Sequence, residues 1–326
     1  MKILITGAGL IGCYAAARLS DAGHDVVLFD LSPPAEYISN VIAKRDIVIR
    51  TGDIVNIRGI PELQPNYEDD NIDMIVHTAG VIGGNARANP YGAMRTNLQG
   101  TIELAEAARL SRVKRIVYAS THGVYDLDKI REAPFVENAP VTAESVYGAT
   151  KLSSEHVLQA FGRAFGMQIV VLRFTNIFGY GEFIGGSSGG IAFQQLLEAA
   201  LDSATASIPQ PLNGPGEWLY VKDAASAIQQ ALEHPLIKNF TLLNIGSGVL
   251  SDENDIVLAT KQFLPKAEFL SSKTQGAPQK STERHQPFEL SAAESEIGFH
   301  PQFSLHDGIA DFIEELKRAR NVPGHR

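Results

Sequence analysis

The 326-residue chain contains a single cysteine, Cys13. One cysteine excludes a disulfide framework within the chain and a cysteine-rich zinc site, and it fits a reducing compartment. Basic residues are in the minority, with 28 Lys and Arg against 37 Asp and Glu and a formal net charge of −9. Because such a chain repels a phosphate backbone and an anionic membrane surface, neither a nucleic acid nor a membrane is an expected partner.

Long apolar runs are also missing, since no stretch reaches the roughly 18 residues that a membrane-spanning helix needs. Lys2 and the apolar run after it are similar to a secretory signal, but Gly7, Gly9 and Gly12 interrupt that run. The histidines form no His-x-His or His-x-x-x-His pair, and no Gly-Lys-Ser/Thr of a P-loop occurs. The sequence therefore predicts a cytoplasmic protein without a metal site.

Short β-branched runs alternate with helical stretches along the first half of the chain. This alternation is typical of parallel βαβ units, and the nearly continuous apolar character of each run indicates strands covered on both faces. The expected strands are 3–5, 26–29, 47–49, 74–76, 116–118 and 169–172. Helices are expected at 101–109 and 147–165, and in the first of them a buried face is predicted for Ile102, Leu104, Ala105 and Ala108.

The alternation decays after about Phe174. The glycine-rich segment 179–190 predicts a flexible loop, because consecutive glycines are costly to order. The apolar segment 242–245 predicts a further strand that returns to the main sheet. Ser304, with Asp307 three residues later, predicts the start of a last amphipathic helix.

The segment from Thr6 to Gly12 follows the first expected strand and precedes good helix formers at 14–19. Its three glycines allow a tight turn, a close approach of backbone to a pyrophosphate, and close packing of helix on strand. Asp30 ends the second expected strand, where a carboxylate accepts hydrogen bonds from an adenosine ribose. Because Asp30 repels a 2′-phosphate and residues 31–34 contain no arginine, we expect NAD rather than NADP.

Tyr147 and Lys151 are four residues apart in an expected helix. Side chains at this spacing share one face, so we expect the phenol and the ammonium to be neighbours. A positive charge about 4 Å from the phenolate stabilises it by roughly 4 kcal/mol at an effective dielectric constant near 20, which lowers the pKa of Tyr147 by about three units. The pair then suits general acid–base catalysis at a substrate hydroxyl. Such pairs also arise by chance, and the dinucleotide motif before this one favours the functional interpretation.

A serine hydrolase is the alternative from another enzyme class, because residues 185–189 match Gly-x-Ser-x-Gly around Ser187. That motif requires a strand before it and a helix after it. Residues 182–184 are a poor strand among so many glycines, so the context disfavours this interpretation.

In these motifs and their order, the chain resembles the extended short-chain dehydrogenase/reductase superfamily, in the group of NAD-dependent epimerases and dehydratases. The residues that carry the resemblance are 6–12, Asp30, 52–54, 77–80, Asn97, 100–101, 119–125, 147–151, 172–176 and 218–223. This set covers most of the chain and is specific for the superfamily, but it is far less specific for the reaction.

The resemblance implies an α/β fold, with a Rossmann-type doubly wound parallel sheet and a smaller C-terminal α+β substrate-binding region. The NAD-binding domain is expected at 1–176 with 218–246 returning to it, and the substrate-binding domain at 177–217 and 247–326. By analogy with the family, helices near Thr101 and Tyr147 would pair across a two-fold axis and form a homodimer.

The resemblance also implies roles for individual residues. Thr121, Tyr147 and Lys151 match the catalytic residues, Ser120 is a rival for the place of Thr121, and Lys151 also bonds the nicotinamide ribose. The implied cofactor-binding residues are Gly7, Gly9, Leu10, Ile11, Gly12, Asp30, Asp53, Ile54, Thr78, Ala79, Gly80, Asn97, Tyr147 and Lys151. Candidate substrate contacts are Arg87, His122 and Asn176, although Arg87 also fits a solvated surface residue and His122 a structural one.

The chain departs from the family where many members bind a nucleotide diphosphate. Such members usually carry an arginine at the position of Gly216, and a second basic pair is not evident at 276–280 unless Lys280 or Arg284 substitutes for it. Two buried phosphates would then lack cationic partners. The sequence therefore predicts an NAD-dependent dehydrogenase acting on a secondary alcohol of a sugar, sugar acid or polyol. The alternative is a nucleotide-sugar epimerase or dehydratase with tightly bound NAD.

Overall fold

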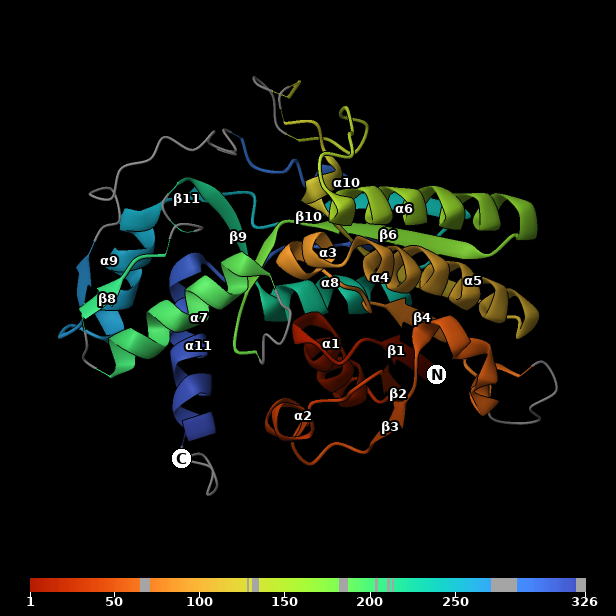
Figure 1. Cartoon of the computed structure of the whole chain (residues 1–326), viewed down its shortest axis with the longest axis horizontal. Helices are drawn as coiled ribbons and strands as arrows, with labels where there is room; N and C mark the ends of the chain where they lie inside the picture. Colours follow the sequence, from red (N-terminus) through yellow and green to blue (C-terminus); the bar gives the residue numbers. More distant parts are fainter. Residues whose placement is uncertain are drawn as a thin grey trace.

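The computed structural model describes residues 1–64, 71–127, 129–130, 135–181, 187–202, 205–209, 212, 214–270 and 286–320. Its centre is a seven-stranded sheet in the order β10-β6-β5-β4-β1-β2-β3, in which every neighbouring pair is parallel. The strands are β1 (Lys2–Thr6), β2 (Asp25–Asp30), β3 (Ile47–Thr51), β4 (Met74–His77), β5 (Arg115–Thr121), β6 (Gln168–Phe174) and β10 (Phe240–Ile245). The order reverses direction at β1, as in a doubly wound Rossmann-type sheet (Figure 1).

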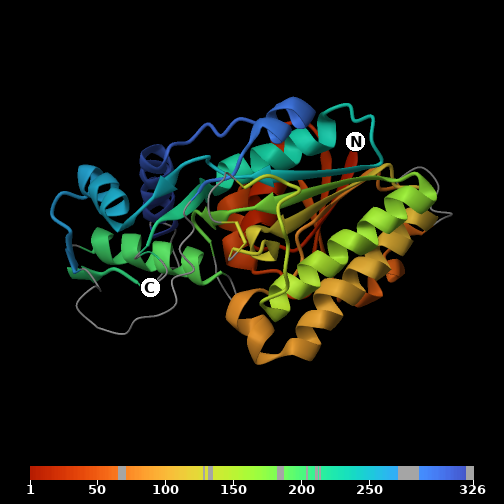
Figure 2. The same cartoon turned by 90° about the horizontal axis from the view of Figure 1, so that it is seen from above.

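Helices cover both faces of this sheet, because successive side chains of each strand point to opposite sides. Ile3 and Ile5 pack in the core that contains α1 (Leu10–Asp21) and α8 (Val221–Glu233), whereas Leu4 packs in the core that contains α5 (Gly100–Leu110) and α6 (Val146–Phe165). Figure 2 shows α5 and α6 on one side of the sheet and α8 on the other. The continuous apolar runs in the sequence therefore correspond to strands buried on both faces, except at β3. This strand lies at the edge of the sheet, where Val48 and Ile49 are 40% and 44% exposed, so the prediction of a covered strand was wrong there.

The predicted strands and the fold class are confirmed, and so is the late strand, because β10 pairs in parallel with β6. The last helix, α11 (Leu305–Arg320), begins after Ser304, whose hydroxyl oxygen accepts a hydrogen bond from the amide of Asp307. The prediction for α5 was wrong at Ile102, which is 39% exposed. Its apolar spacing identified a helix face, but Ile102 lies at the margin of the face that the sheet covers.

A smaller region follows the main sheet (Figure 1). It contains a three-stranded sheet of β7 (Asn176–Phe178), β9 (Gly216–Tyr220) and β11 (Leu250–Ser251), and a two-stranded sheet of β8 (Thr205–Ser207) and β12 (Glu268–Leu270). Its helices are α7 (Ser188–Leu201), α9 (Glu253–Phe263) and α11, while α10 (Ser291–Ile297) packs near β10. Within 218–246, α8 and β10 belong to the layers of the main sheet, whereas β9 lies in the smaller sheet. The domain boundaries stay a prediction.

The predicted loop 179–190 is shorter than expected, since α7 already begins at Ser188. The Ser187 hydroxyl accepts a hydrogen bond from the amide of Gly190 and so caps the helix. This cap stabilises the two glycines of the first turn despite their poor helix propensity. Residues 182–186, including the first two positions of the Gly-x-Ser-x-Gly match, lie outside the described residues.

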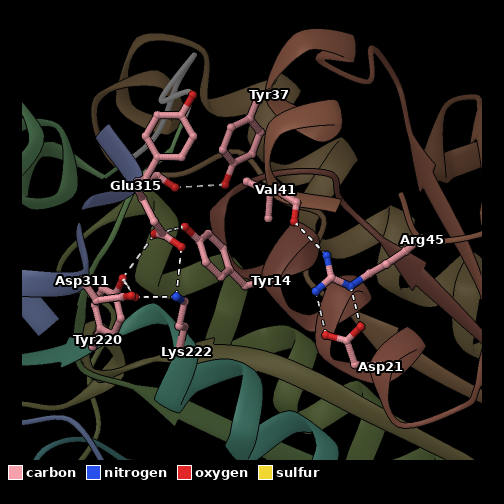
Figure 3. A network of polar contacts seen from close by, with 10 residues as sticks. Tyr14, Asp21, Tyr37, Val41, Arg45, Tyr220, Lys222, Asp311 and Glu315 are labelled. Carbon is pink, nitrogen blue, oxygen red and sulfur yellow. Dashed lines mark hydrogen bonds and ion pairs between the residues drawn. The ribbon is translucent and has the colours of Figure 1, made fainter. Parts of the chain in front are cut away.

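The last helix is fixed to α1, β9 and α8 by a network of polar contacts (Figure 3). Tyr14 from α1 and Tyr220 from β9 both donate hydrogen bonds to Glu315, at 2.5 and 3.2 Å, and Lys222 from α8 forms an ion pair with Glu315 at 3.0 Å. A cavity of about 690 Å³ lies beside this network, and none of the predicted site residues lines it. The network therefore holds α11 against α1 away from the candidate site. Among the described residues, no helix is both long and apolar enough to cross a membrane.

Candidate cofactor and catalytic site

The turn between β1 and α1 depends on two glycines. Gly7 has φ +93°, and a Cβ there would lie 2.7 Å from the amide nitrogen of Ala79 at the end of β4. A Cβ on Gly12 would lie 1.8 Å from the carbonyl oxygen of Gly7. Neither position has room for a side chain. Because Gly7 and Gly12 lack one, the turn can pack tightly against the chain that follows β4.

The third glycine faces open space. A Cβ on Gly9 would meet no described atom within 4 Å, and Gly9 is the N-cap of α1 without a capping side chain. The amide groups of the first turn, which includes Leu10 and Ile11, therefore present their partial positive charge to that space. These residues fit the pyrophosphate of a dinucleotide.

Asp30 lies beside this turn at the end of β2. Its two carboxylate oxygens accept hydrogen bonds from the amides of Ala8 and Ser32, each at 2.8 Å. The carboxylate is thus held at the edge of the glycine turn, where it can still accept from ribose hydroxyls through its remaining lone pairs. Its position fits the predicted contact with an adenosine ribose.

Replacing Asp30 by alanine is expected to weaken the preference for NAD over NADP by about ten-fold, because a negative charge next to the 2′-phosphate is lost. The ratio of the two dissociation constants, measured by calorimetry, checks this. Asp25→Asn is the matched control, since Asp25 lies at the opposite end of the same strand. An unchanged ratio in Asp30→Ala would remove Asp30 from this role.

Two further predicted cofactor residues lie at the start of the 3₁₀ segment η1 (Ile54–Gly59). The carboxylate of Asp53 accepts from the amide of Val55 and forms an ion pair with Arg95 at 3.1 Å. Ile54 is 5% exposed and packs against Gly100 of α5. The Asp53 carboxylate is therefore positioned at the surface, whereas Ile54 can reach a cofactor mainly through its backbone.

The chain after β4 is fixed by side-chain hydrogen bonds. Thr78 donates from its hydroxyl to the carbonyl oxygen of Thr6 at 2.8 Å. Asn97 lies in the π-helical segment η3 (Arg95–Gln99), accepts from the amide of Val81 at 2.7 Å and donates to its carbonyl at 2.9 Å. Gly80 lies between these anchors and is exposed. The predicted set of Thr78, Ala79, Gly80 and Asn97 therefore lies together after β4, next to the glycine turn.

The three predicted catalytic residues meet at the carboxyl end of β5. The Tyr147 phenol lies close enough to Thr121, the last residue of that strand, for the Thr121 side chain to lower its pKa. Lys151 is 3% exposed and donates from Nζ to the carbonyl oxygen of Ala119 at 2.8 Å. A Cβ on Gly80 would lie 3.6 Å from the same Nζ, which places Lys151 beside the β4 loop. The site thus spans the ends of β4 and β5, next to the glycine turn.

The electrostatics differ from the sequence prediction. Burial raises the pKa of Tyr147, and the hydrogen bond with Thr121 opposes this shift only in part. Burial lowers the pKa of Lys151 to about 8, while the charge of Glu155 raises it. The predicted lowering of the Tyr147 pKa was therefore wrong for this structure. Helix spacing correctly placed the two residues on one face, but the ammonium is held by the Ala119 carbonyl and lies 5.9 Å from the centre of the Tyr147 ring.

The structure separates Thr121 from its rival Ser120. Neighbouring residues of a strand point to opposite faces, and the Ser120 hydroxyl donates to the buried carboxylate of Glu155. Thr121 is the hydroxyl that contacts Tyr147. The arrangement therefore favours Thr121 as the residue that orients a substrate hydroxyl.

His77, at the end of β4, was not predicted as a functional residue. It is fully buried, its Nδ1 is 2.7 Å from the Thr6 hydroxyl, and its Nε2 is 3.0 Å from the Thr101 hydroxyl. Burial, together with the charge of Lys151, lowers its pKa to about 3. His77 is therefore neutral, and it ties β1, β4 and α5 together beneath the site.

This buried histidine predicts a loss of stability in acid. Between its ordinary pKa near 6.5 and its folded value of about 3, the unfolded state binds a proton that the folded state does not. The unfolding free energy should fall as the pH drops through this window, by about 5 kcal/mol in full. Urea unfolding of the natural protein and of His77→Gln between pH 7 and 4 checks this. A variant whose stability falls as steeply as that of the natural protein would refute it.

The predicted substrate-contacting residues do not form one cluster beside Thr121, Tyr147 and Lys151. His122 follows Thr121 and begins the 3₁₀ turn η4 (His122–Val124), and Asn176 donates to the Glu217 carbonyl at 3.3 Å. Arg87 is exposed on α3 (Gly83–Ala88), and no hydrogen bond or ion pair links it to the catalytic trio within the described residues. Lys280 and Arg284 lie outside the described residues. All of these remain predictions.

Comparison with known proteins connects this geometry to a family. Residues 3–246 match the NAD dependent epimerase/dehydratase family. The chain is 26% identical to a UDP-glucose 4-epimerase of Corynebacterium glutamicum over 76% of each chain. It is also 26% identical to a dTDP-L-rhamnose 4-epimerase of Burkholderia thailandensis, covering 97% of this chain and 96% of that one.

Solved structures share the fold. A UDP-glucose 4-epimerase of Stenotrophomonas maltophila, with NAD and formylated UDP-arabinopyranose, superimposes with a TM-score of 0.82 at 24% identity and covers 98% of this chain and 99% of its own. A UDP-glucuronic acid 4-epimerase of Bacillus cereus, with UDP-glucuronic acid and NAD, gives a TM-score of 0.78 at 24% identity and the same coverage. At these identities the likeness shows the fold alone.

Proposed function

The chain belongs to the NAD-dependent epimerase/dehydratase family of extended short-chain dehydrogenases/reductases, and from that premise we propose that it is an epimerase that inverts one carbon of a nucleotide sugar and retains its NAD. The observation that carries the proposal is the junction of Thr121, Tyr147 and Lys151 at the end of β5, beside a glycine turn that fits a pyrophosphate. The relatives' names, which specify UDP- and dTDP-sugar 4-epimerases, support the substrate class.

The site residues have a clear division of work. The chemistry that NAD supplies when bound is removal of a hydride from the carbinol carbon and its return. Tyr147, ionised to the phenolate, accepts the hydroxyl proton at its phenolic oxygen as the carbonyl forms and gives it back when the alcohol is restored. Thr121 holds the substrate oxygen in line with the phenol, and the positive charges of Lys151 and of bound NAD would favour the phenolate against the burial that raises the Tyr147 pKa. Inversion requires the intermediate ketone to present its other face before the hydride returns.

A specific observation keeps the dehydrogenase as a second candidate. A Cβ on Gly216 would lie 2.9 Å from Nε1 of Trp218. The indole therefore occupies the space that an arginine side chain would need at this position, which favours a substrate without a diphosphate. The epimerase is nevertheless the better supported candidate, because relatives that match the chain nearly end to end act on nucleotide sugars by name.

The two candidates are separated by one assay. Purified protein is incubated with UDP-glucose, UDP-galactose, UDP-glucuronic acid and dTDP-L-rhamnose and, in parallel with added NAD, with free sugars and sugar acids. The sugar products are followed by NMR together with NADH absorbance. The proposal expects an epimer at equilibrium and no net NADH. Stoichiometric NADH, formed only with free sugars or sugar acids and added NAD, would establish the dehydrogenase instead.

We also propose that the protein is a homodimer through α5 and α6. These helices and the preceding α4 (Pro90–Met94) expose Tyr91, Met94, Ile102, Leu110 and Phe165, each by at least 39%. Apolar side chains on two neighbouring helices suit a helical interface. Sedimentation of Ile102→Lys as a monomer, against a dimer for the natural chain, is the expected result. A cytoplasmic location stays a prediction from the sequence.

A further inference from the structure

Helix α6 contacts the end of β5 at three successive turns. Tyr147 lies near Thr121, whose side chain lowers its pKa, Lys151 donates to the Ala119 carbonyl, and Glu155 accepts from the Ser120 hydroxyl. Residues four apart lie above one another on a helix, so the three side chains form a column along α6. Tyr147 and Lys151 belong to the proposed catalytic site, whereas Glu155 has not been assigned a function in it.

Glu155 forms a buried ion pair with Arg173. Glu155 is 3% exposed, and Arg173 of β6 is 4% exposed. Arg173 donates from Nε and Nη2 to the two carboxylate oxygens, at 3.0 and 2.6 Å. Arg173 is also the register partner of Ser120 in the sheet and lies 4.7 Å from the Tyr125 ring centre. Glu155 thus connects α6, β5 and β6 directly behind Thr121.

The charge of Glu155 also acts on Lys151. The titratable side chains around the ammonium are Tyr118 of β5, whose ring centre is 4.6 Å from Nζ, His77 of β4, and Tyr147 and Glu155 of α6 itself. Burial raises the pKa of both tyrosines and lowers that of His77, so all three are neutral near pH 7. Glu155 is therefore the one anion in this group.

We propose that Glu155 is a positioning residue of the site: its carboxylate fixes the Ala119–Thr121 strand end through Ser120, and its negative charge keeps the neighbouring Lys151 ammonium protonated. The expected effect of Glu155 on turnover rests on the proposed epimerase function. The effect of Glu155 on the protonation of Lys151 does not rest on that function, and it can be measured without substrate.

The direct test is a titration of Lys151. The protein is labelled with [ε-¹³C]lysine, and the Lys151 signal is assigned by its loss in Lys151→Met. In the natural chain we expect a midpoint near pH 8. In Glu155→Gln the ammonium loses its neighbouring anion, so the midpoint should move down by about one pH unit. An unchanged midpoint in a folded variant would overturn the proposal.

Two further variants protect this test against misfolding. Glu155→Gln leaves the Arg173 charge buried without its anion, which is destabilising. The double variant Glu155→Gln/Arg173→Met removes both charges, a change that buried ion pairs often tolerate. Because the unpaired Arg173 charge is then also absent, the midpoint should move down in the same direction but by less than in Glu155→Gln. Tyr125→Phe is the matched control, because it removes the hydrogen bond to Asn244 next to Arg173 without a change of charge. Its Lys151 midpoint should not move.

The strand-fixing role has its own variant. Ser120→Ala removes only the hydroxyl that joins β5 to Glu155. We expect kcat to fall about ten-fold with KM within two-fold and the Lys151 midpoint unchanged, because Thr121 loses its alignment rather than its substrate contacts. An unchanged kcat would remove this role. Absence of epimerase activity in the natural chain would instead refute the proposed function and leave the titration result standing.

Discussion

Tyr147→Phe is expected to lower the rate of epimerisation by about 1,000-fold while the purified protein keeps its NAD, because the variant loses only the phenolic oxygen that carries the proton. The ring stays in place, and Lys151 keeps its hydrogen bond to the Ala119 carbonyl. The hydride then leaves a carbinol whose proton has no acceptor. Single-turnover rates and the absorbance of protein-bound cofactor are the measurements.

Tyr125→Phe is the control for this prediction. Tyr125 is also buried and also loses a single hydroxyl hydrogen bond, here the 2.6 Å contact to Asn244. Its effect on turnover should stay within a few-fold. If Tyr147→Phe retained more than a tenth of the natural rate, Tyr147 would not be the general base, and another group would have to accept the proton.

Gly12→Ala is expected to abolish NAD binding and to lower the free energy of unfolding by about 3 kcal/mol, the upper range for a forced insertion into a packed site. The added Cβ would lie 1.8 Å from the carbonyl oxygen of Gly7, which is backbone and cannot rotate away. The glycine turn would have to open, and α1 would lose its position against β1. Urea unfolding and the NAD content of the purified variant are the measurements.

Gly9→Ala separates the two parts of this effect. A Cβ on Gly9 would meet no described atom within 4 Å, so its stability should change by less than about 0.5 kcal/mol. Its NAD affinity should still fall, because the methyl group points into the space assigned to the pyrophosphate. Equal loss of stability in both variants would show that the turn is sensitive to any side chain.

The strands were predictable because sheet strands buried on both faces need continuous apolar runs, and the glycine turn because few residue types allow its backbone. Ile102 shows the limit of the same reasoning, since apolar spacing identifies a helix face but not which surface covers it. The start of α7 shows another, because the Ser187 cap overrides the glycines after it.

The placement of Tyr147 and Lys151 on one helix face was predictable from their spacing, but their electrostatics were not. Spacing on a helix places Lys151 beside Tyr147 and says nothing about burial, which is the largest cause of both pKa shifts. The sequence contained a signal for Glu155, four residues after Lys151 and with Arg173 in the next strand. The sequence alone could not assign Glu155 a function, because only the structure shows that Ser120 and Arg173 both donate to its carboxylate.

In the proposed reaction the hydride leaves one carbon of a nucleotide sugar and returns to the same carbon. A UDP-sugar deuterated at the epimerised carbon distinguishes this route, with the product analysed by NMR and mass spectrometry. We expect the epimer to retain the deuterium at that carbon, with none released into water and no NADH accumulating. Loss of the label to solvent, or its recovery in free NADH, would contradict it.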